Sequence, residues 1–320
     1  MNVLYLPFFG MKGYLLNAYF LNRIIKKLRP DVTNVHYASG YGILALLSNI
    51  KPYILSVWGS DVYKTPYESK VKKLLINKSL LNAQIIASTS CAMAKQVNGL
   101  HASTKHNIAI TPFGINTSTF KSHRRIFSNE IITIGIVKTL EHRYGIDLLL
   151  NAFAQVKAIL KKNNSKKVIK LVVVGGGHLE SELKKLALKL NIEADVDFVG
   201  RVDNSLVVDY INKMDIFVVP SRIESFGVAA VEALACERPC IVANTGGLPE
   251  VIIDGETGLV VEAESANAIA LSIVYLINNP DKAIEMGISG RLDVIHKYDE
   301  FHTVQKMIEL YKTFISKNSH

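Results

Sequence analysis

Cysteine is scarce in this sequence. Its 320 residues include only Cys91, Cys236 and Cys240, which excludes a disulfide framework and fits a reducing compartment. Cys236 and Cys240 have a C-x3-C spacing, but no further cluster of Cys or His completes a zinc site. We therefore expect these two cysteines to be small buried residues and expect no bound metal.

Acidic residues are scarce in the first part of the chain. Residues 1–125 contain 16 Lys and Arg but 3 Asp and Glu, whereas residues 126–320 contain 21 and 25. The first part therefore carries a net charge of +13 and the remainder −4, which favours an anionic partner for the first part. Because no recognised nucleic-acid-binding module occurs, we expect no nucleic acid partner and favour an anionic membrane surface.

Long uninterrupted apolar runs are also missing. Residues 1–22 are apolar and aromatic, but they lack the basic n-region of a signal peptide and contain Pro7 and Lys12. The pattern favours a strand at residues 2–8 followed by an amphipathic helix at residues 14–28. We expect a cytoplasmic protein, located at the inner face of the cell membrane if the basic part contacts lipid.

The most informative stretch is residues 216–258. It opens with the apolar run 216–219, which is typical of a strand buried on both faces. The segment ESFG at 224–227 then leads directly into 228–236, an Ala-rich run of helical character. A helix N-terminus after the carboxyl end of a buried strand is where open α/β sheets hold ligands, and its free N–H groups suit a phosphate.

Two carboxylates flank the start of this helix. Glu224 precedes it, and Glu232 lies eight residues later, about two helical turns along. An isolated pair at this spacing is more often a helix cap and a solvated surface residue. Carboxylates are also good acceptors for sugar hydroxyls, and beside an anion-binding helix end they indicate a nucleotide sugar.

An ordered series of residues in this stretch resembles the retaining glycosyltransferases of family 4. The matching residues are Pro220-Ser221, Glu224, Phe226-Gly227, Glu232-Ala233, Ala235-Cys236, Pro239, Gly246-Gly247, Pro249-Glu250 and Thr257-Gly258-Leu259. The resemblance implies an α/β protein of the GT-B fold, with two Rossmann-like domains facing a central cleft. One departure is Glu237, where the family usually has Gly; we expect it to alter a helix end and not the chemistry.

The resemblance also implies roles in donor binding. Glu224 would bind hydroxyls of the donor sugar and Glu232 those of the ribose. Backbone amides at Phe226 and Gly227, next to Ser225, would contact the donor sugar or phosphate.

Two further segments of the second half fit this donor site. Lys138 and Arg143 flank the positions of the family's pyrophosphate-binding cations, which here are Thr139 and Tyr144, and they resemble a branch of the family acting in bacterial surface-polysaccharide assembly (lipopolysaccharide or capsule). Cations there would stabilise the leaving diphosphate. A glycine loop around Gly176 would let the backbone approach the ligand closely, and the turn at Arg201 and Val202 would meet the base.

On the acceptor side, three residues of the first half are candidates. His36 ends a segment similar to the family's "PD-hydrophobic-x-H" strand, although a lone His is more often structural. Trp58 stands where most family members have His. This replacement removes a titratable group, so the residue cannot act as a general acid or base. It could instead stack on a sugar ring or serve as bulk lining the cleft. Asp61 could orient the acceptor or cap the following helix.

The length and composition allow two domains of ordinary size. We expect an acceptor-side domain at residues 1–125, shortened relative to the family, and a nucleotide-sugar-binding domain at residues 126–299. The polar segment 121–129 is the expected linker. Residues 300–320 are amphipathic, and we expect a helix that packs back across the domains.

The resemblance implies a metal-independent, retaining hexosyltransferase without a cofactor. It would move a sugar from a nucleotide-diphosphate donor to a glycan or lipid-linked acceptor in cell-surface polysaccharide synthesis. A DxD metal motif is formally present at residues 195–197, but it lies at the start of a strand, where we interpret it as a chance match. The alternatives are a nucleotide-sugar epimerase, a sugar phosphorylase, and a sugar-nucleotide-binding or assembly subunit without turnover.

Overall fold

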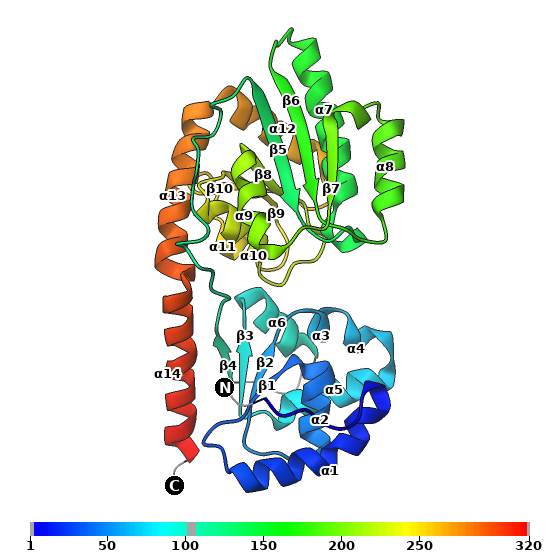
Figure 1. The fold of residues 1–320 in the computed structure, drawn as a ribbon, viewed down its shortest axis with the longest axis vertical. Helices are drawn as coiled ribbons and strands as arrows, with labels where there is room; N and C mark the ends of the chain where they lie inside the picture. The colour runs from blue at the N-terminus through cyan, green and yellow to red at the C-terminus, as the bar shows by residue number, and fades with distance from the viewer. Residues whose placement is uncertain (1–2, 101–106, 319–320) are drawn as a thin grey trace. The chain divides into compact units, whose positions relative to one another are not determined.

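The chain folds into two units, each built on a parallel β-sheet (Figure 1). The computed structural model describes residues 3–100 and 107–318. The first unit comprises residues 1–112 and 304–320, and the second comprises residues 113–303. The sequence suggested boundaries after residues 125 and 299, whereas the contacts assign residues 113–125 to the second unit. Two parallel-sheet α/β units confirm the expected fold class.

The first unit contains a four-stranded sheet of order β1-β2-β3-β4. Its strands are β1 (Asn34–His36), β2 (Ile54–Val57), β3 (Ile85–Ser88) and β4 (Ile108–Ile110). Its helices are α1 (Gly10–Leu28), the π-helical turn η1 (Tyr37–Tyr41), α2 (Gly42–Leu47), α3 (Ser60–Tyr63), α4 (Thr65–Glu68), α5 (Lys70–Asn82) and α6 (Cys91–Leu100), with the C-terminal part of α14 (Glu300–Asn318).

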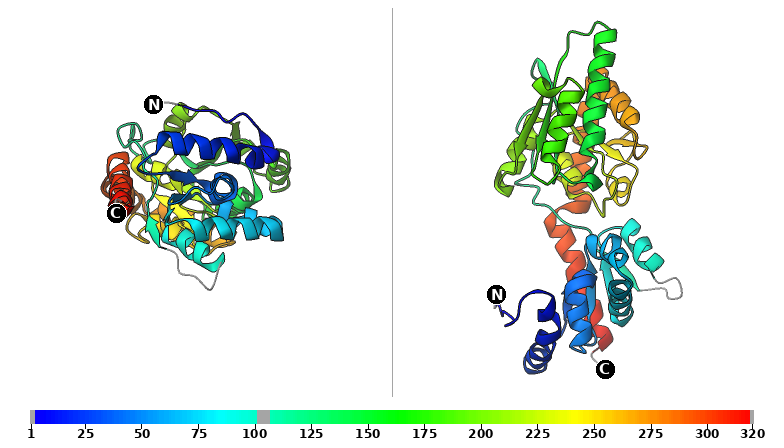
Figure 2. Two further views of the ribbon diagram at one scale, coloured as in Figure 1. Left: turned by 90° about the horizontal axis from the view of Figure 1, so that it is seen from below. Right: turned by 90° about the vertical axis from the view of Figure 1, so that its right-hand side faces the viewer.

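Both faces of this sheet are covered by apolar side chains. Leu55 and Val57 belong to a core formed with α2, α5 and α6. Ile54, on the opposite face, packs with Phe314 of α14, and Figure 2 shows α14 running alongside the sheet. Because successive strand residues point to opposite faces, burial on both sides explains why these strands are continuously apolar.

The second unit contains a six-stranded sheet of order β10-β9-β8-β5-β6-β7. Its strands are β5 (Ile131–Val137), β6 (Val168–Val174), β7 (Val196–Gly200), β8 (Ile216–Val219), β9 (Cys240–Ala243) and β10 (Gly258–Val261). Its helices are α7 (Ile146–Lys162), α8 (Glu180–Lys189), α9 (Asn204–Lys213), α10 (Val228–Ala235), α11 (Leu248–Val251), α12 (Ala266–Asn278) and α13 (Pro280–Tyr298), with the short turns η2 (His142–Tyr144) and η3 (Glu193–Asp195).

Strand β8 lies near the middle of this sheet. Ile216 and Val218 pack with α7 and α12 on one face, and Phe217 and Val219 pack with α9 and α10 on the other. All four residues are buried, as the sequence predicted for this run. The carboxyl end of β8 therefore opens onto the loop that carries Glu224.

The strand predicted at residues 2–8 is wrong for the described residues 3–8, which form no strand, and α1 already begins at Gly10. The side chain of Asn17 takes the hydrogen-bonding groups that a neighbouring strand would need. It accepts from the Phe8 N–H at 3.2 Å and donates to the Phe8 carbonyl at 2.8 Å. Most of the apolar side chains of this segment are exposed.

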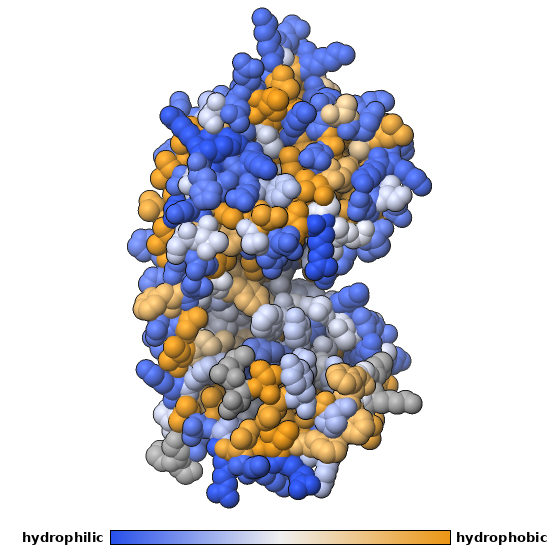
Figure 3. All heavy atoms as spheres, viewed as in Figure 1, coloured by the Kyte–Doolittle hydropathy of each residue, from blue (hydrophilic) through white to orange (hydrophobic). Residues whose placement is uncertain are grey.

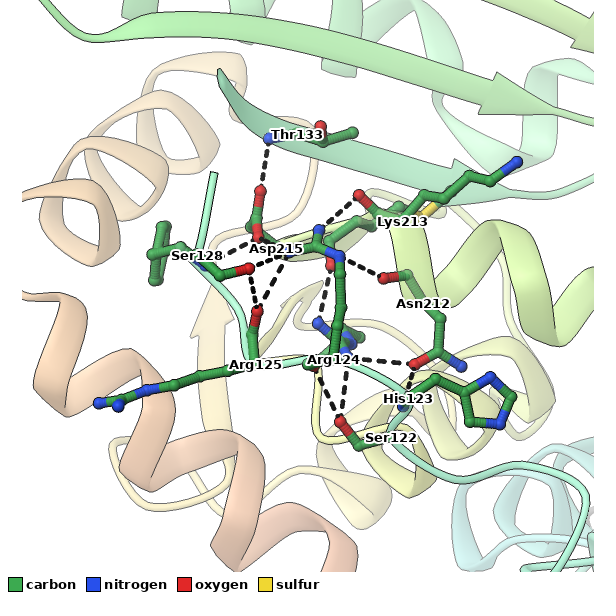
Figure 4. Close-up of polar contacts among 12 residues, drawn as sticks. Ser122, His123, Arg124, Arg125, Ser128, Thr133, Asn212, Lys213 and Asp215 are labelled. Carbon is green, nitrogen blue, oxygen red and sulfur yellow. Dashed lines mark hydrogen bonds and ion pairs between the residues drawn. The ribbon is translucent and has the colours of Figure 1, made fainter. Parts of the chain in front are cut away.

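The segment interpreted as a linker is held firmly within the second unit (Figure 4). Asp215 accepts hydrogen bonds from the backbone N–H groups of Phe127 and Thr133, and its carboxylate lies 3.0 Å from the Arg124 guanidinium. The fully buried Arg238 donates to the carbonyl of Arg124 at 2.7 Å. These bonds explain why the polar segment 121–129 packs with the second unit.

Candidate functional site

In the second unit, an ion pair joins the loop after β5 to the loop after β8. The Lys138 ammonium donates to the Glu224 carboxylate at 2.6 Å, and both side chains are largely buried. The strands β5 and β8 are parallel neighbours, so their carboxyl ends lie at the same sheet edge. The structure thus brings together two of the residues predicted to bind the donor.

Glu232 lies about one turn into α10, near the same ammonium. Burial raises the pKa of Glu232 to about 7, and the charge of Lys138 acts against this rise. Within the described part of the chain, no group donates a hydrogen bond to this carboxylate. Glu232 is half-buried, and a partly desolvated acceptor without a donor is costly, so a hydroxyl of a ligand would satisfy this carboxylate.

The start of α10 offers free backbone donors. Gly227 is the N-cap residue, and its carbonyl accepts from the N–H of Ala230 at 2.9 Å. Among the described residues, none accepts from the N–H groups of Phe226 or Gly227. Ser221 adds a buried hydroxyl without a partner in the described residues. Free amides at a helix N-terminus suit an anion.

The loop carrying Glu224 is held in place by a close backbone approach at Gly246. This residue has φ of +52°, and a Cβ there would lie 1.6 Å from the carbonyl oxygen of Glu224. The N–H of Gly247 donates to that same carbonyl at 3.2 Å. Only glycine fits at position 246, which gives a physical reason for the Gly-Gly pair that the resemblance rests on.

Arg222 was not singled out from the sequence, yet it connects three parts of the second unit. Its guanidinium donates to both carboxylate oxygens of Asp147 at 2.8 and 2.7 Å, and to Glu264 at 2.9 Å. Burial raises the pKa of Asp147, but the hydrogen bonds and charge of Arg222 outweigh this and lower it overall. Arg222 therefore fixes the β8 loop against the start of α7.

Arg143 and Lys138 share one aromatic ring. The guanidinium carbon of Arg143 and the ammonium of Lys138 each lie 4.6 Å from the centroid of the Tyr144 ring. Arg143 also pairs with Glu141 at 2.9 Å. Tyr144, which occupies the position of a usual family Lys, thus holds both cations by cation–π contact. Sequence spacing alone did not reveal this role.

The glycine loop after β6 packs against the loops carrying the predicted cations and base-contacting residues. Gly175 has φ of +135°, and a Cβ there would lie 2.0 Å from the Lys138 carbonyl oxygen. Gly176 lies beside Arg201, since a Cβ added at Gly176 would be 3.6 Å from the Cβ of Arg201. Arg201 is exposed and Val202 is half-buried. Among the described residues, no hydrogen bond or ion pair joins these two directly to Glu232.

Glu237 lies just beyond α10 in a left-handed conformation, with φ of +60°. This is the position after the helix end where glycine is usual. The expectation that Glu237 affects a helix end is therefore matched by its backbone. Its side chain lies 3.9 Å from Arg291.

In the first unit, Asp61 is fully buried and binds backbone groups. Its carboxylate accepts from the N–H groups of Ala38 at 2.8 Å, Trp58 at 3.1 Å and Gly59 at 2.8 Å. Burial raises the pKa of Asp61, and these hydrogen bonds act against the rise. Asp61 thus connects the turn after β1 to the loop after β2, and its oxygens are already occupied.

His36 and Trp58 lie side by side at the ends of β1 and β2. The indole N–H of Trp58 donates to Nδ1 of His36 at 3.2 Å, with ring centroids 5.3 Å apart. Burial lowers the pKa of His36, which favours the neutral form that can accept this bond. All three acceptor-side candidates therefore belong to one cluster of the first unit.

Comparison with known proteins identifies the family. The model for "Glycosyl transferases group 1" matches residues 119–293, which is more than half of the chain. The chain belongs to this family. A second model, "Glycosyl transferase 4-like", matches residues 7–90, so the predicted family resemblance is confirmed at this level.

Individual relatives agree with this assignment. An uncharacterized glycosyltransferase of Methanocaldococcus jannaschii is 29% identical, over 91% of this chain and 78% of its own length. N-acetyl-alpha-D-glucosaminyl L-malate synthase of Bacillus anthracis is 26% identical, over 88% and 74%. The sucrose-phosphate synthase structure from Thermosynechococcus elongatus has a TM-score of 0.82 at 22% identity, covering 97% and 81%. The protein is a glycosyltransferase of the GT-B type.

Neither a membrane-spanning helix nor a metal-binding cluster occurs among the described residues. Across residues 3–100 and 107–318, no helix is both long and apolar enough to cross a membrane. In the same residues, no group of three or more His, Cys, Asp or Glu side chains is arranged to hold a metal ion. Asp195, in the formal DxD match, forms an ion pair with Lys157.

Proposed function

We propose that the protein transfers a hexose from a nucleotide-diphosphate donor to a glycan or lipid-linked acceptor, with retention of anomeric configuration, in cell-surface polysaccharide synthesis. The observation that carries the proposal is the group formed by Lys138, Glu224 and Glu232 beside the free amides of α10. It combines a cation and N–H donors for a diphosphate with two acceptors for hydroxyls.

Each group has a defined part in the proposed reaction. The Lys138 and Arg143 cations stabilise charge that develops on the departing diphosphate. Glu232 accepts from a ribose hydroxyl, and Glu224 exchanges part of its bond with Lys138 for hydroxyls of the donor sugar. The bond from the anomeric carbon to phosphate breaks as the bond to the acceptor oxygen forms on the same face. The acceptor's proton passes to the departing phosphate oxygen. No metal or cofactor takes part in this proposal.

Several relatives support a nucleotide-sugar donor and a cell-surface product. The Anabaena HepE structure, with a TM-score of 0.77 at 16% identity, is a complex with UDP-glucose. A Corynebacterium glutamicum relative, 31% identical over 52% of this chain, is a GDP-mannose-dependent mannosyltransferase. Staphylococcus aureus CapM, 26% identical over 73%, acts in capsular polysaccharide biosynthesis. UDP and GDP sugars are therefore the donors to test first.

Calorimetric titration tests this donor site. We expect UDP or GDP to bind, and Lys138→Ala to weaken binding roughly 10- to 100-fold because a charge-assisted contact is lost. The matching nucleoside without phosphates should lose affinity with Glu232→Ala but not with Lys138→Ala. Lys282→Ala, at an exposed pair on α13, is the matched control. If no nucleotide binds, the proposal fails; binding without transfer to any acceptor would indicate the assembly subunit.

We also propose that the first unit contacts an anionic membrane through α1 and the segment before it. Residues 3–20 expose large apolar side chains, with Phe9 at 88% and Tyr5 at 86%. Basic residues follow in the last turns of α1, including Lys26 and Lys27, and residues 1–30 contain no Asp or Glu. Figure 3 shows hydrophobic side chains gathered over α1 beside a hydrophilic rim. Such a surface suits the interface of a bilayer with anionic lipids.

Vesicle sedimentation tests this contact. We expect the protein to bind vesicles of phosphatidylglycerol and phosphatidylcholine more than vesicles of phosphatidylcholine alone, and less at high salt. The double substitution Lys26→Glu with Lys27→Glu should reduce binding, because it inverts two charges at the rim. The double substitution Lys306→Glu with Lys312→Glu in α14 is the control with equal charge change. Equal binding of both double variants would contradict the proposed surface.

A further inference from the structure

Two exposed aromatic rings lie together in the first unit. Tyr37 and Trp58 are stacked, with ring centroids 5.5 Å apart and an interplanar angle of 29°. Tyr37 is 38% exposed and Trp58 is 36% exposed. They follow β1 and β2, which are parallel neighbours, so both rings lie at the edge of the sheet where its strands end. Each of these large aromatic residues therefore keeps more than a third of its surface accessible to a ligand.

Hydrogen bonds to Asp61 and His36 fix the positions of the two aromatic residues. Asp61 binds the N–H of Trp58 and that of Ala38, the residue after Tyr37, so a single buried carboxylate fixes both backbones. His36 accepts the indole N–H of Trp58 and sets the orientation of that ring. An accidental surface contact needs no such support, whereas a binding surface gains from preorganisation.

Tyr37 also has a strained backbone. Its φ of +68° lies in the left-handed region, which costs a residue with a bulky side chain about 1–2 kcal/mol. The π-helical turn η1 begins at this residue. Tyr37 nevertheless keeps 38% of its surface exposed, so the strained residue leaves part of its ring accessible to a ligand. Strained residues cluster at ligand-binding sites, and here the strained residue carries a partly exposed ring beside Trp58.

We propose that Tyr37 and Trp58 form a stacking platform for an uncharged pyranose ring of the acceptor. The C–H face of a sugar ring is apolar and fits against aromatic faces, whereas an anionic group would be repelled by the negative faces of the two rings. Tyr37 is thus a specificity-determining residue on the acceptor side. His36 and Asp61 are positioning residues. The assignment to the acceptor rests on the proposed transferase function, while binding of a sugar ring does not.

Tryptophan fluorescence can report ligand binding at this site. Trp58 is the only tryptophan in the sequence, so all indole fluorescence comes from the platform. We would titrate the protein, without nucleotide, with the methyl glycosides of glucose, galactose and mannose. Sorbitol at equal concentration is the control, since it is a polyol without a ring. We expect a saturable change in Trp58 emission with at least one glycoside and none with sorbitol.

Variants at position 37 distinguish a loss of glycoside binding caused by the missing ring from one caused by misfolding. Tyr37→Gly removes the ring and relieves the left-handed strain, so we expect the protein to stay folded with at least a fivefold weaker response to the glycoside. Tyr37→Phe keeps the ring and should respond within twofold of the natural protein. Tyr41→Ala, an exposed tyrosine of the same turn, should leave the response unchanged.

Three results would overturn the platform. These are no saturable change with any glycoside, an equal change with sorbitol, or an unchanged apparent Kd in Tyr37→Gly. A change in Trp58 emission with anionic vesicles but not with glycosides would overturn it in favour of a lipid contact. Nucleotide calorimetry measures binding to the second unit separately. If the natural protein binds nucleotide but shows no response to any glycoside, the platform alone is refuted.

Discussion

The candidate site of the second unit is built from charged groups, whereas that of the first unit is built from aromatic rings. In the second unit, ion pairs such as Lys138–Glu224 join loops that follow parallel strands. In the first unit, Trp58 stacks on Tyr37 and bonds to His36 in the equivalent loops. The same strand-end architecture therefore supports two kinds of chemistry, one suited to a diphosphate and one to a neutral ring.

The fully buried Asp61 and the half-buried Glu232 also differ in how their carboxylates are hydrogen-bonded. Asp61 accepts three backbone hydrogen bonds, whereas Glu232 accepts none from the described residues. Burial raises the pKa of both, and only for Asp61 do hydrogen bonds oppose it. We infer that the satisfied carboxylate stabilises the fold and that the unsatisfied one is kept for a ligand.

Replacing Asp61 tests the first half of this comparison and should have the largest effect. Asp61→Ala leaves three buried N–H groups without an acceptor, and we expect a loss of about 3–5 kcal/mol in the free energy of unfolding. Asp61→Asn keeps one carbonyl acceptor and should lose less. Urea unfolding followed by circular dichroism measures both. A loss below about 1 kcal/mol for Asp61→Ala would show that the carboxylate does not hold the two loops.

Replacing Glu232 tests the second half of this comparison. Here we expect the substitution to increase stability, whereas replacing Asp61 should decrease it. The pKa of Glu232 is about 7 in the folded protein against 4.5 ordinarily. Between these values the folded protein keeps a proton that the unfolded chain has lost, so stability falls as pH rises from 4.5 to 7. Glu232→Gln avoids this penalty and should be more stable than the natural protein by on the order of 3 kcal/mol above pH 7, with no gain at pH 4.

Urea unfolding at pH 4, 5.5 and 8 measures this difference, and nucleotide calorimetry should show weaker binding by the same variant. Glu224→Gln is the matched control, because Glu224 already pairs with Lys138 and its loss should destabilise the protein at neutral pH. If Glu232→Gln gives no gain in stability at pH 8, the Glu232 carboxylate carries no penalty from burial without a hydrogen-bond donor, and the inference that it is kept for a ligand fails.

The sequence predicted features whose residues are close together in the chain, and it missed contacts between residues that are far apart in the chain. The β8–α10 segment was predicted because its signals are local: an apolar run, a Glu-containing turn and an Ala-rich helix. Arg222 was missed because Asp147 and Glu264 lie 75 and 42 residues away in sequence. Local pattern carries no information about such partners.

Other differences also come from contacts that the pattern of apolar and polar residues does not show. The apolar segment before α1 reads as a strand, but the side chain of Asn17 takes the backbone groups of Phe8. The polar segment 121–129 reads as a linker, but distant Asp215 and Arg238 bind its backbone. In the first unit, Trp58 was considered for stacking, whereas Tyr37 was missed because its left-handed backbone is visible only in the structure.

Arg222 offers a sharper test of the charged site. Arg222→Lys keeps the charge but loses the planar fork that bonds both oxygens of Asp147. We expect a loss of about 1–2 kcal/mol in stability, limited by the exposure of Glu264, and weaker nucleotide binding. Arg201→Lys, at an exposed residue, should leave stability unchanged. Equal nucleotide affinity in Arg222→Lys would show that this fork does not position the site.

Titration of His36 should give the smallest effect and tests the aromatic site. Burial lowers its pKa below the ordinary 6.5, so the unfolded chain takes up the proton first. The contribution of neutral His36 to stability is therefore present above pH 6.5 and is lost as pH falls toward the folded pKa. Protonation also converts Nδ1 into a donor, which breaks its bond with the Trp58 indole.

We expect Trp58 emission to be constant above pH 7 and to change as the pH falls below 6.5, with little change in the cooperative unfolding of the protein. His36→Asn is the control, because its side-chain oxygen can accept the indole bond near the place of Nδ1 and does not titrate. Its emission should stay constant through the same pH range. An identical pH profile in His36→Asn would mean that another group titrates near Trp58, and that the ring is not positioned through His36.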